Sequence, residues 1–428
     1  MKKLILIIFL FAIGIQAQNE KTTKLIDDVE SKVIEWRRDF HEHPELSNRE
    51  FETAKKIAAH LKSLGMEVQT GVAHTGVIGI LKGGKAGPVI GLRADIDGLP
   101  VTERVEIPFA SKVKSTYNGI ETGVMHACGH DTHTAMLMGT AEVLSKMKKD
   151  LKGTVKFIFQ PAEEGAPEGE EGGAKMMVKE GVLKNPDVDV IFGLHISAQT
   201  PVGYITYKSG GTMAAAQRFV IKVHGKQTHG SRPWGGVDPI VISAQIINGL
   251  QTIISRDTDL TKEAAVISVG LIRGGVRNNI IPEEVEMIGT IRTLDPDMQK
   301  KLNDMMIFRV KAIAESYGGT ADISISEGLP ITYNDPALTA QMLPSLQDSA
   351  GKDHVIQINA ITGAEDFSFF QKEIPGLYFF VGGRPLDVKM EDAASHHTPD
   401  FFIDESGLKL GVTSMVNLTL DYMNNSGK

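Results

Sequence analysis

The sequence contains one cysteine, Cys128, and therefore cannot form an internal disulfide bond. Aromatic residues make up only 6% of it, and lysine and arginine form no dense run. The formal net charge is −8 over 428 residues. Because a surface that follows phosphates needs concentrated positive charge, these absences argue against nucleic acid as a partner.

An apolar run long enough to cross a bilayer is also absent at the N-terminus. The run from Leu4 to Ile15 is shorter than the roughly 20 residues that a membrane-spanning helix needs. Lys2 and Lys3 precede it and a polar segment follows, which is typical of a secretory signal peptide covering residues 1–18. We therefore expect export to the periplasm or the medium and no stable membrane span, with an N-terminal membrane anchor as the alternative. In an oxidising compartment a single thiol is a liability unless something occupies it.

The chain is longer than one hydrophobic core usually supports, so we expect two domains. In residues 19–211 and 327–428, helical patterns alternate with apolar strands, which predicts an α/β catalytic domain with an open mixed sheet. Residues 212–326 show the order β-α-β-β-α-β of a ferredoxin-like unit. We interpret this α+β segment as a smaller domain inserted into the catalytic one.

Polar side chains follow several predicted strands of the catalytic domain at the point where each strand ends. Ligands of open α/β sheets bind at the carboxyl ends of strands. Thiolate, imidazole and carboxylate groups together suit zinc, manganese or cobalt better than calcium or magnesium, so the sequence predicts a metal site. The candidates are Asp95, Asp97, Cys128, His130, Glu163, Glu164 and His195, with His396 and His397 near the C-terminus.

The adjacent Glu163 and Glu164 need different roles. A carboxylate bound to a cation is a poor base, because the metal lowers its pKa. A carboxylate held just beside the metal can take a proton from water and return it to a leaving amine. We expect one glutamate to be a ligand and the other a general base, and the pattern leaves open which is which.

Nine segments in order along the chain resemble one known family. They are GLRADIDGLP, MHACGHDTHTAM, QPAEEG, GLH, GVDP, NIIP, GTIRT, GAEDF and HTPDF. Together they resemble the dinuclear metallo-amidohydrolases, a family of aminoacylases, hippurate hydrolases and auxin-conjugate hydrolases within a clan of metal-dependent exopeptidases. The resemblance runs from Trp36 to Phe402.

The resemblance implies two divalent metal ions, with zinc, manganese, cobalt and nickel as the candidates. It places the metal ligands at Cys128, His130, Glu164, His195 and His397. Cys128 would be shared between the two ions, and Glu163 would be the catalytic base. His396 remains an alternative to His397. Asp95, Asp97, Asp131, Glu365 and Asp366 are expected to orient ligands rather than bind the metal.

The inserted segment resembles the family's lid or dimerisation domain, which implies a homodimer. Its His229 matches a lid histidine that reaches the substrate carbonyl, where it could stabilise an oxyanion. Asn279 and Arg292 match positions that hold the polar end of the substrate, although Arg292 could equally make an ordinary ion pair. Trp234 stands near where other members often carry a second histidine, so it could line the acyl pocket or only pack the lid.

The sequence therefore predicts an exported enzyme that cleaves the amide bond of N-acyl amino acids with a metal-activated water. The alternatives are a dipeptidase or carboxypeptidase with the same metal site, and a metal-dependent binding protein without catalysis. Three other histidines are not expected to bind the metal. We expect His41 to be solvated or to cap a helix. His126 and His133 are expected to contact the ligands or to be ordinary hydrogen-bonded polar residues.

Overall fold

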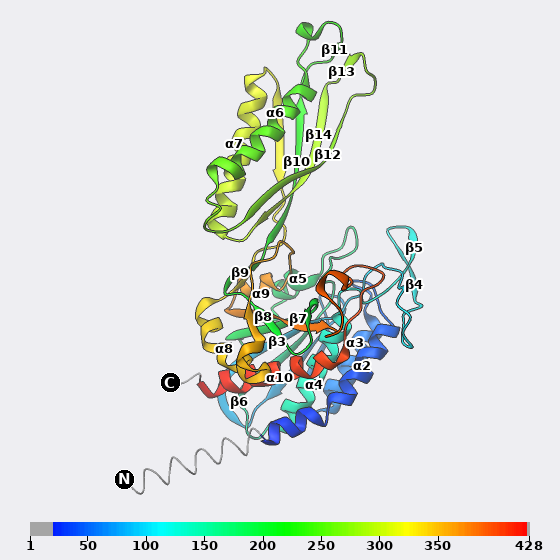
Figure 1. The fold of residues 1–428 in the computed structure, drawn as a ribbon, viewed down its shortest axis with the longest axis vertical. Helices are drawn as coiled ribbons and strands as arrows, with labels where there is room; N and C mark the ends of the chain where they lie inside the picture. The colour runs from blue at the N-terminus through cyan, green and yellow to red at the C-terminus, as the bar shows by residue number, and fades with distance from the viewer. Residues whose placement is uncertain (1–19, 426–428) are drawn as a thin grey trace, which may run out of the picture. The chain divides into compact units, whose positions relative to one another are not determined.

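The computed structural model of the chain describes residues 20–425, and the predicted signal peptide, residues 1–18, lies outside them. The described chain forms two compact units (Figure 1). The first takes up residues 20–209, 334–358 and 369–425, and the second takes up residues 210–333 and 359–368. Within residues 20–425, no helix combines the length and the apolar character that crossing a membrane requires.

The first unit is built on one mixed sheet of eight strands, in the order β1-β2-β6-β3-β7-β18-β8-β17. Its central strands β6, β3, β7 and β18 run parallel to one another, whereas β2 is antiparallel to both β1 and β6, and β8 is antiparallel to β18. The strands are β1 (Glu67–Val72), β2 (Gly76–Lys82), β3 (Lys85–Asp95), β6 (Lys152–Gln160), β7 (Val190–Pro201), β8 (Ile205–Tyr207), β17 (Val355–Gln357) and β18 (Gly376–Arg384). This arrangement confirms the predicted α/β class with an open mixed sheet.

Helices cover this sheet, and the helices and strands together form the main hydrophobic core. Helix α4 is buried along nearly its whole length, because α2 and α10 pack against it while it packs against β3. The central strands are also almost wholly buried, and their runs of Val, Ile, Leu and Phe fit a sheet covered by helices. The helices of this unit are α2 (Glu30–Glu42), α3 (Phe51–Ser63), α4 (His130–Lys146), α5 (Gly173–Lys179), α8 (Pro336–Ala350), α9 (Ser368–Gln371, which begins at the unit boundary) and α10 (Leu408–Asn425).

Strand β7 departs from the expectation that His195 marks the end of a strand. The strand continues to Pro201, so His195 lies in its middle. Its pairing explains why this position is still open: β7 pairs with β3 only as far as Gly193, whereas its pairing with β18 continues past His195. One side of β7 is therefore free of strand partners where His195 lies.

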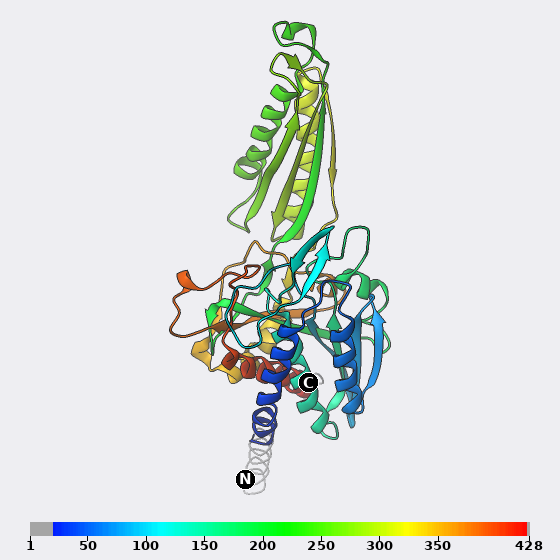
Figure 2. The same cartoon turned by 90° about the vertical axis from the view of Figure 1, so that its right-hand side faces the viewer.

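The second unit is a four-stranded antiparallel sheet, in the order β12-β14-β10-β15, with two helices on one face (Figure 2). Burial alternates along β10, as expected for a sheet with one covered face. The elements follow the predicted β-α-β-β-α-β order: β10 (Ala215–His224), α6 (Pro239–Thr252), β12 (Ala265–Gly274), β14 (Glu284–Thr293), α7 (Pro296–Ser316) and β15 (Thr320–Ile325). Helix α6 begins as the sequence predicts, since Asp238 accepts hydrogen bonds from the N–H groups of Ile240 and Val241.

Short elements complete the described chain. Three two-stranded pairs are formed by β4 (Lys114–Tyr117) with β5 (Ile120–Gly123), β9 (Gly210–Met213) with β16 (Thr332–Asn334), and β11 (Thr228–His229) with β13 (Ile280–Ile281). Single turns of other helix types lie at Pro233–Gly235, Ile253–Asp257, Lys352–His354, Met390–Asp392 and Glu405–Gly407.

Candidate metal centre

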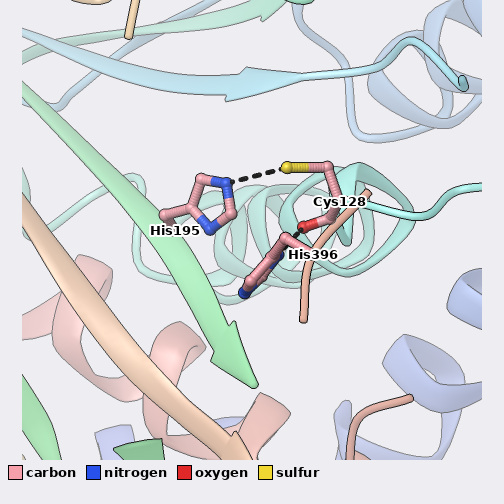
Figure 3. Close-up of side chains that lie close together, drawn as sticks. All are labelled: Cys128, His195 and His396. Carbon is pink, nitrogen blue, oxygen red and sulfur yellow. Dashed lines mark hydrogen bonds between the residues drawn. The ribbon is translucent and has the colours of Figure 1, made fainter. Parts of the chain in front are cut away.

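The thiol of Cys128 lies between two imidazole rings of the first unit. Its Sγ is 3.3 Å from Nε2 of His195 and 3.3 Å from Nε2 of His397 (Figure 3 shows the His195 contact). Two ligands of one tetrahedral zinc ion, with Zn–S near 2.3 Å and Zn–N near 2.05 Å, lie about 3.5 Å apart. The spacing of these three side chains, which the sequence predicted as ligands, therefore suits coordination.

Glu164 and His130 bring further donor atoms to the same place. Oε1 of Glu164 lies 2.9 Å from Nε2 of His397 and 4.0 Å from Nε2 of His130. Both Oε1 of Glu164 and Nε2 of His130 are buried and have no partner with hydrogen-bond geometry among residues 20–425. A buried nitrogen that makes no hydrogen bond is costly, so Nε2 of His130, facing the carboxylate of Glu164 at 4.0 Å, points to a cation that both would bind.

The ring nitrogens of the histidines are oriented by backbone groups. Nδ1 of His195 lies 2.5 Å from the carbonyl oxygen of Ile196, and Nδ1 of His130 lies 2.9 Å from that of Asp97. A carbonyl oxygen can only accept, so each Nδ1 carries a proton, and in the neutral ring the lone pair is then on Nε2. Histidines that bind metals are usually held in this way.

His396 and His397 are distinguished by what their nitrogens contact. Nδ1 of His396 donates to the backbone oxygen of Cys128 at 3.1 Å (Figure 3), and its Nε2 accepts from the N–H of Ala198 at 3.1 Å. A neutral ring offers one donor and one acceptor, so both nitrogens of His396 are already used by the backbone. Although His396 lies within 4.8 Å of Cys128 and His195, the nitrogen next to both Sγ and Glu164 belongs to His397.

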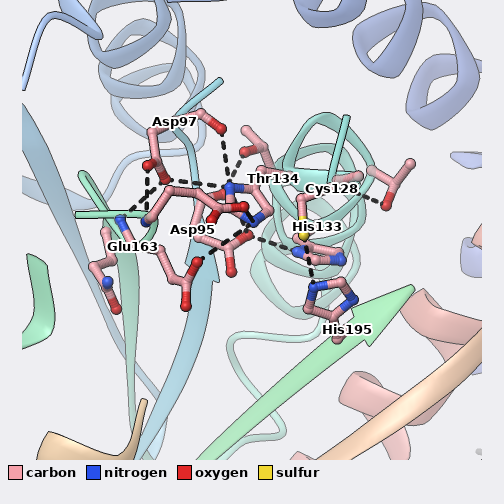
Figure 4. A network of polar contacts seen from close by, with 12 residues as sticks. Asp95, Asp97, Cys128, His133, Thr134, Glu163 and His195 are labelled. Carbon is pink, nitrogen blue, oxygen red and sulfur yellow. Dashed lines mark hydrogen bonds and ion pairs between the residues drawn. The ribbon is translucent and has the colours of Figure 1, made fainter. Parts of the chain in front are cut away.

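Asp97 holds three parts of the site at once (Figure 4). Its Oδ1 and Oδ2 accept the N–H groups of Glu163 and Glu164, each at 3.1 Å, and Oδ1 also lies 3.2 Å from Nδ1 of His130. Ser47 donates its hydroxyl to Oδ2 at 2.8 Å. Asp97 is 1% exposed and its carboxylate faces these donors, so it orients neighbouring side chains.

Asp95 also holds a neighbouring side chain in place, that of His133. Its Oδ1 lies 2.6 Å from Nδ1 of His133, whose Nε2 accepts the N–H of Ile196 at 2.8 Å. Arg93 donates to the other oxygen of Asp95 at 2.7 Å. Both nitrogens of His133 therefore serve the backbone and Asp95, and this chain of contacts fixes β7 next to His195.

Three residues of the site have positive φ, a conformation that sequence patterns did not reveal. Gly129, between Cys128 and His130, has φ of +96°, and a Cβ there would lie 2.3 Å from Cγ2 of Ile196, so only glycine fits. Ala162 has φ of 51° and His397 has φ of 63°. A left-handed conformation costs roughly 1–2 kcal/mol for a residue with a Cβ, and such residues cluster at functional sites.

The charges of the site favour a cation. Burial raises the pKa of the Cys128 thiol, and the charge of Glu164 raises it further. Hydrogen bonds to Cys128 and to Glu164 raise the pKa of His397 to about 10, whereas burial holds the pKa of His195 well below its usual range. Coordination of a divalent ion stabilises a thiolate and neutral imidazoles together. The donor set of sulfur, nitrogen and carboxylate oxygen fits zinc or a similar ion.

Two histidines near the site differ from the sequence-based expectation. The expectation for His41 was wrong, since its side chain is 1% exposed, with Nδ1 2.8 Å from Oδ2 of Asp131 and Nε2 3.1 Å from Oε1 of Glu103. The same oxygen of Asp131 lies 2.8 Å from Nε of Arg37, so Asp131 pairs with these cations instead of orienting a ligand. His126 is buried, neither ring nitrogen has a hydrogen-bond partner within the described chain, and burial lowers its pKa to about 4.

The predicted substrate residues belong to the second unit. His229 is exposed on β11, next to β13, and the N–H and hydroxyl of Ser231 lie 3.1 and 2.7 Å from its Nδ1. Oδ1 of Asn279 is buried without a hydrogen-bond partner in residues 20–425. Arg292, on β14, is half-buried and makes none of the ion pairs found in the described chain. Trp234 is 78% exposed, so it does not pack within this unit.

Glu365 and Asp366 are buried members of the second unit, and their predicted role in orienting ligands stays a prediction. Sequence reasoning missed one buried carboxylate of the first unit, Glu50, which contacts the backbone just before Glu163. No local signal could have found it, because Glu50 lies in a polar helix start and its partner is 112 positions away.

Comparison with known proteins is consistent with this geometry. Residues 91–421 match the family described as Peptidase family M20/M25/M40. The chain is 42% identical over 407 residues to thermostable carboxypeptidase 2 of Saccharolobus solfataricus, covering 95% of this chain and 99% of the relative. It is 39% identical over 381 residues to the N-acetylcysteine deacetylase of Bacillus subtilis, covering 88% and 93%. The crystal structure of the Bacillus subtilis YXEP protein, described as a dinuclear metal binding peptidase from the M20 family, superposes with a TM-score of 0.77 at 36% identity, covering 93% of this chain and 99% of that one.

Proposed function

The chain belongs to peptidase family M20/M25/M40 and is a metal-dependent amidohydrolase, and from that premise we propose that its substrates are N-acyl amino acids, which it cleaves to a carboxylic acid and a free amino acid. The observation that carries this proposal is the group of metal-type donors around Cys128, with two adjacent glutamates beside it. A relative at 39% identity whose name states deacetylation of N-acetylcysteine supports the substrate class.

We assign the metal ligands to Cys128, His130, Glu164, His195 and His397. Cys128 is the natural shared ligand of two ions, because its Sγ approaches His195 as well as His397. His396 is left out because its ring nitrogens both contact backbone groups. When bound, the divalent ions supply Lewis acidity toward the scissile carbonyl and the attacking water.

We assign the proton transfers to Glu163. Its carboxylate lies 3.9 Å from Nε2 of His130 and is about one-tenth exposed, so it borders the ligand cluster while remaining reachable by water. In the reaction it accepts a proton from the attacking water while the water oxygen bonds to the carbonyl carbon. When the C–N bond breaks, the same proton passes from Glu163 to the amine nitrogen.

We assign recognition of the substrate to three residues of the second unit, His229, Asn279 and Arg292. Two donors of Ser231 point at Nδ1 of His229, so this nitrogen accepts and the ring proton resides on Nε2. An imidazole of this tautomer can donate to the oxyanion that forms from the carbonyl. Arg292 and Asn279 would bind the carboxylate of the amino acid, a role that suits a guanidinium without an ion-pair partner among residues 20–425.

The test is a hydrolysis screen with defined metal content. Protein lacking residues 1–18 is stripped with a chelator and reloaded separately with zinc, manganese, cobalt or nickel, and amine release is followed for N-acetyl and N-benzoyl amino acids. We expect activity that depends on reloading and that is lost in Glu163→Gln at unchanged metal content. Metal-loaded protein with no activity on any N-acyl amino acid would overturn the proposal.

Carboxypeptidase activity is the second candidate, because thermostable carboxypeptidases 2 and 1 of Saccharolobus solfataricus are 42% and 41% identical to this chain. The same metal chemistry would cleave a peptide bond instead of an N-acyl bond. Dipeptides and N-blocked dipeptides in the same screen separate the two. A higher kcat/KM for peptides than for N-acetyl and N-benzoyl amino acids would favour the carboxypeptidase.

We also propose that the protein is exported and forms a homodimer. Export is supported by the charged and apolar start of the sequence, and fractionation of cells expressing the chain with and without residues 1–18 tests it. For the dimer, the support is the ferredoxin-like unit, which has an open edge at β12. Sedimentation of the purified protein tests the dimer, and a single monomer-sized species would refute it.

A further inference from the structure

Glu50 is a buried carboxyl group whose side chain is not needed by its own helix. It is 0% exposed and stands just before α3, at the position whose side chain often caps a helix. Its side chain makes no capping hydrogen bond there. The free N–H groups of Glu52 and Thr53 are instead accepted by the carboxylate of Glu45, at 3.2 and 2.8 Å.

The side chain of Glu50 contacts the turn that follows β6. Its Oε1 accepts the N–H of Ala162 at 2.9 Å, and its Oε2 lies 2.5 Å from Oγ1 of Thr75. Ala162 is the residue directly before Glu163 and has φ of 51°. Because this conformation is unfavourable for alanine, the surrounding structure must hold it in place.

Three consecutive N–H groups in this turn are thus bound by two buried carboxyl groups. Ala162 donates to Glu50, while Glu163 and Glu164 donate to Asp97. All three N–H groups point toward these acceptors, so the two carboxyl groups hold the backbone of the turn from which both glutamate side chains extend. Without either acceptor, a buried N–H group would lack a partner, and the turn would relax to satisfy it.

We propose that Glu50 is a positioning residue, whose carboxyl oxygen holds the N–H of Ala162 and thereby fixes the turn that presents Glu163 and Glu164 to the metal centre. The inference deepens the proposed function and rests on it for the roles of the two glutamates. It assigns Glu50 no contact with the substrate or the ions.

The protonation of Glu50 suggests a matched variant. Burial raises the pKa of Glu50, and the nearby charge of Asp97 raises it further, to about 8. Near neutral pH the group is therefore mainly a neutral acid, with one carbonyl oxygen that accepts and one hydroxyl that donates. Thr75 donates its hydroxyl to Oε2 at 2.5 Å. Glutamine keeps an oxygen that can accept the N–H of Ala162, and its amide nitrogen can donate to Oγ1 of Thr75.

The experiment compares three variants of the protein lacking residues 1–18: Glu50→Ala, Glu50→Gln and Glu45→Ala. Zinc affinity is measured by competition with a chromophoric chelator, and kcat and KM are measured on the best substrate. For Glu50→Ala we expect zinc affinity to fall about 10- to 100-fold, as for loss of other groups that orient ligands, and kcat to fall with little change in KM. Glu50→Gln should stay close to wild type.

Glu45→Ala is the control for damage to the same helix. It removes the cap of α3 but not the contact with Ala162, so it should lower thermal stability and leave zinc affinity and kcat unchanged. If Glu50→Ala does not fold, Glu50→Met replaces it, since methionine fills a similar volume without an acceptor. The proposal fails if the variant without an acceptor matches Glu45→Ala in zinc affinity, or if Glu50→Gln is as impaired as that variant.

Zinc affinity also separates this inference from the proposed function. Wild-type protein that binds two ions but hydrolyses none of the substrates would refute the function. The affinities of the Glu50 variants would still decide whether Glu50 positions the turn.

Discussion

Nδ1 of His396 lies 3.1 Å from the backbone oxygen of Cys128, whereas the thiol of the same cysteine faces the next residue, His397. His396 therefore contacts the backbone of Cys128, and His397 contacts its side chain. The positive φ of His397 turns the chain so that neighbouring side chains can point in these different directions.

This division predicts opposite outcomes for two neighbouring substitutions. His397→Ala removes a donor nitrogen beside Sγ and Glu164, so we expect loss of at least one metal equivalent and a fall in activity of more than about 100-fold. His396→Ala leaves the N–H of Ala198 without its acceptor, which should cost about 1–3 kcal/mol of stability while both ions remain bound. Metal analysis and thermal unfolding check the pair, and a normal metal content in His397→Ala would contradict the assignment.

Substitutions of Glu163 and Glu164 should affect metal binding and activity differently. Glu163→Gln keeps the shape of the side chain but cannot accept a proton, so we expect kcat to fall by about 10²–10⁴ with two ions still bound. Glu164→Gln removes a charged oxygen located 2.9 Å from His397, so we expect weaker metal binding and an activity that excess metal partly restores. Titration of activity with zinc distinguishes the two, and rescue of Glu163→Gln by zinc would be evidence against its role as the base.

Replacement of the single cysteine tests the shared ligand. Serine is smaller and its hydroxyl is a much poorer ligand than a thiolate, so Cys128→Ser should lose metal and activity together. The fold should survive, because the helix that follows is held by its own buried contacts. Circular dichroism and metal analysis check both parts, and a Cys128→Ser protein with two ions at full occupancy would disprove the central assignment.

Much of the fold could be predicted because local patterns agree with it. The order of strands and helices followed from hydrophobic periodicity, and Asp238 with Pro239 marked the start of α6 through ordinary capping chemistry. The candidate ligands could be found because parallel strands deliver their carboxyl ends to one edge, as β3 does at Asp95 and β6 does just before Glu163.

The rest depends on contacts between residues far apart in the sequence. His41 pairs with Asp131, 90 positions away, and no periodicity signals that such a histidine is buried. Glu50 likewise contacts Ala162, which is 112 positions away in the sequence, and no periodicity signals that contact. The choice between His396 and His397 rested on the family pattern at the sequence level, because the separation of their contacts arises from backbone conformation.

The buried pair of His41 and Asp131 predicts a specific dependence of stability on pH. Burial lowers the pKa of His41, but the charge of Asp131 and hydrogen bonds to Asp131 and Glu103 outweigh it, so the pKa is raised overall. A raised pKa in the folded state means that the contribution to stability is complete below the unfolded value of about 6.5 and is lost as pH rises through the folded value. His41→Asn should therefore lower the thermal midpoint most below about pH 6.5 and progressively less as the pH rises above it.

His43, two residues further along, supplies the matched control. Its side chain is 58% exposed and lies 3.3 Å from Asp39, an exposed pair of the kind that contributes little to stability. His43→Asn should therefore shift the midpoint only slightly. Because metal binding itself depends on pH, both variants are compared with wild type at saturating zinc. A difference for His41→Asn that grows as pH rises would mean that the buried imidazole is neutral, and that Arg37 alone balances the charge of Asp131.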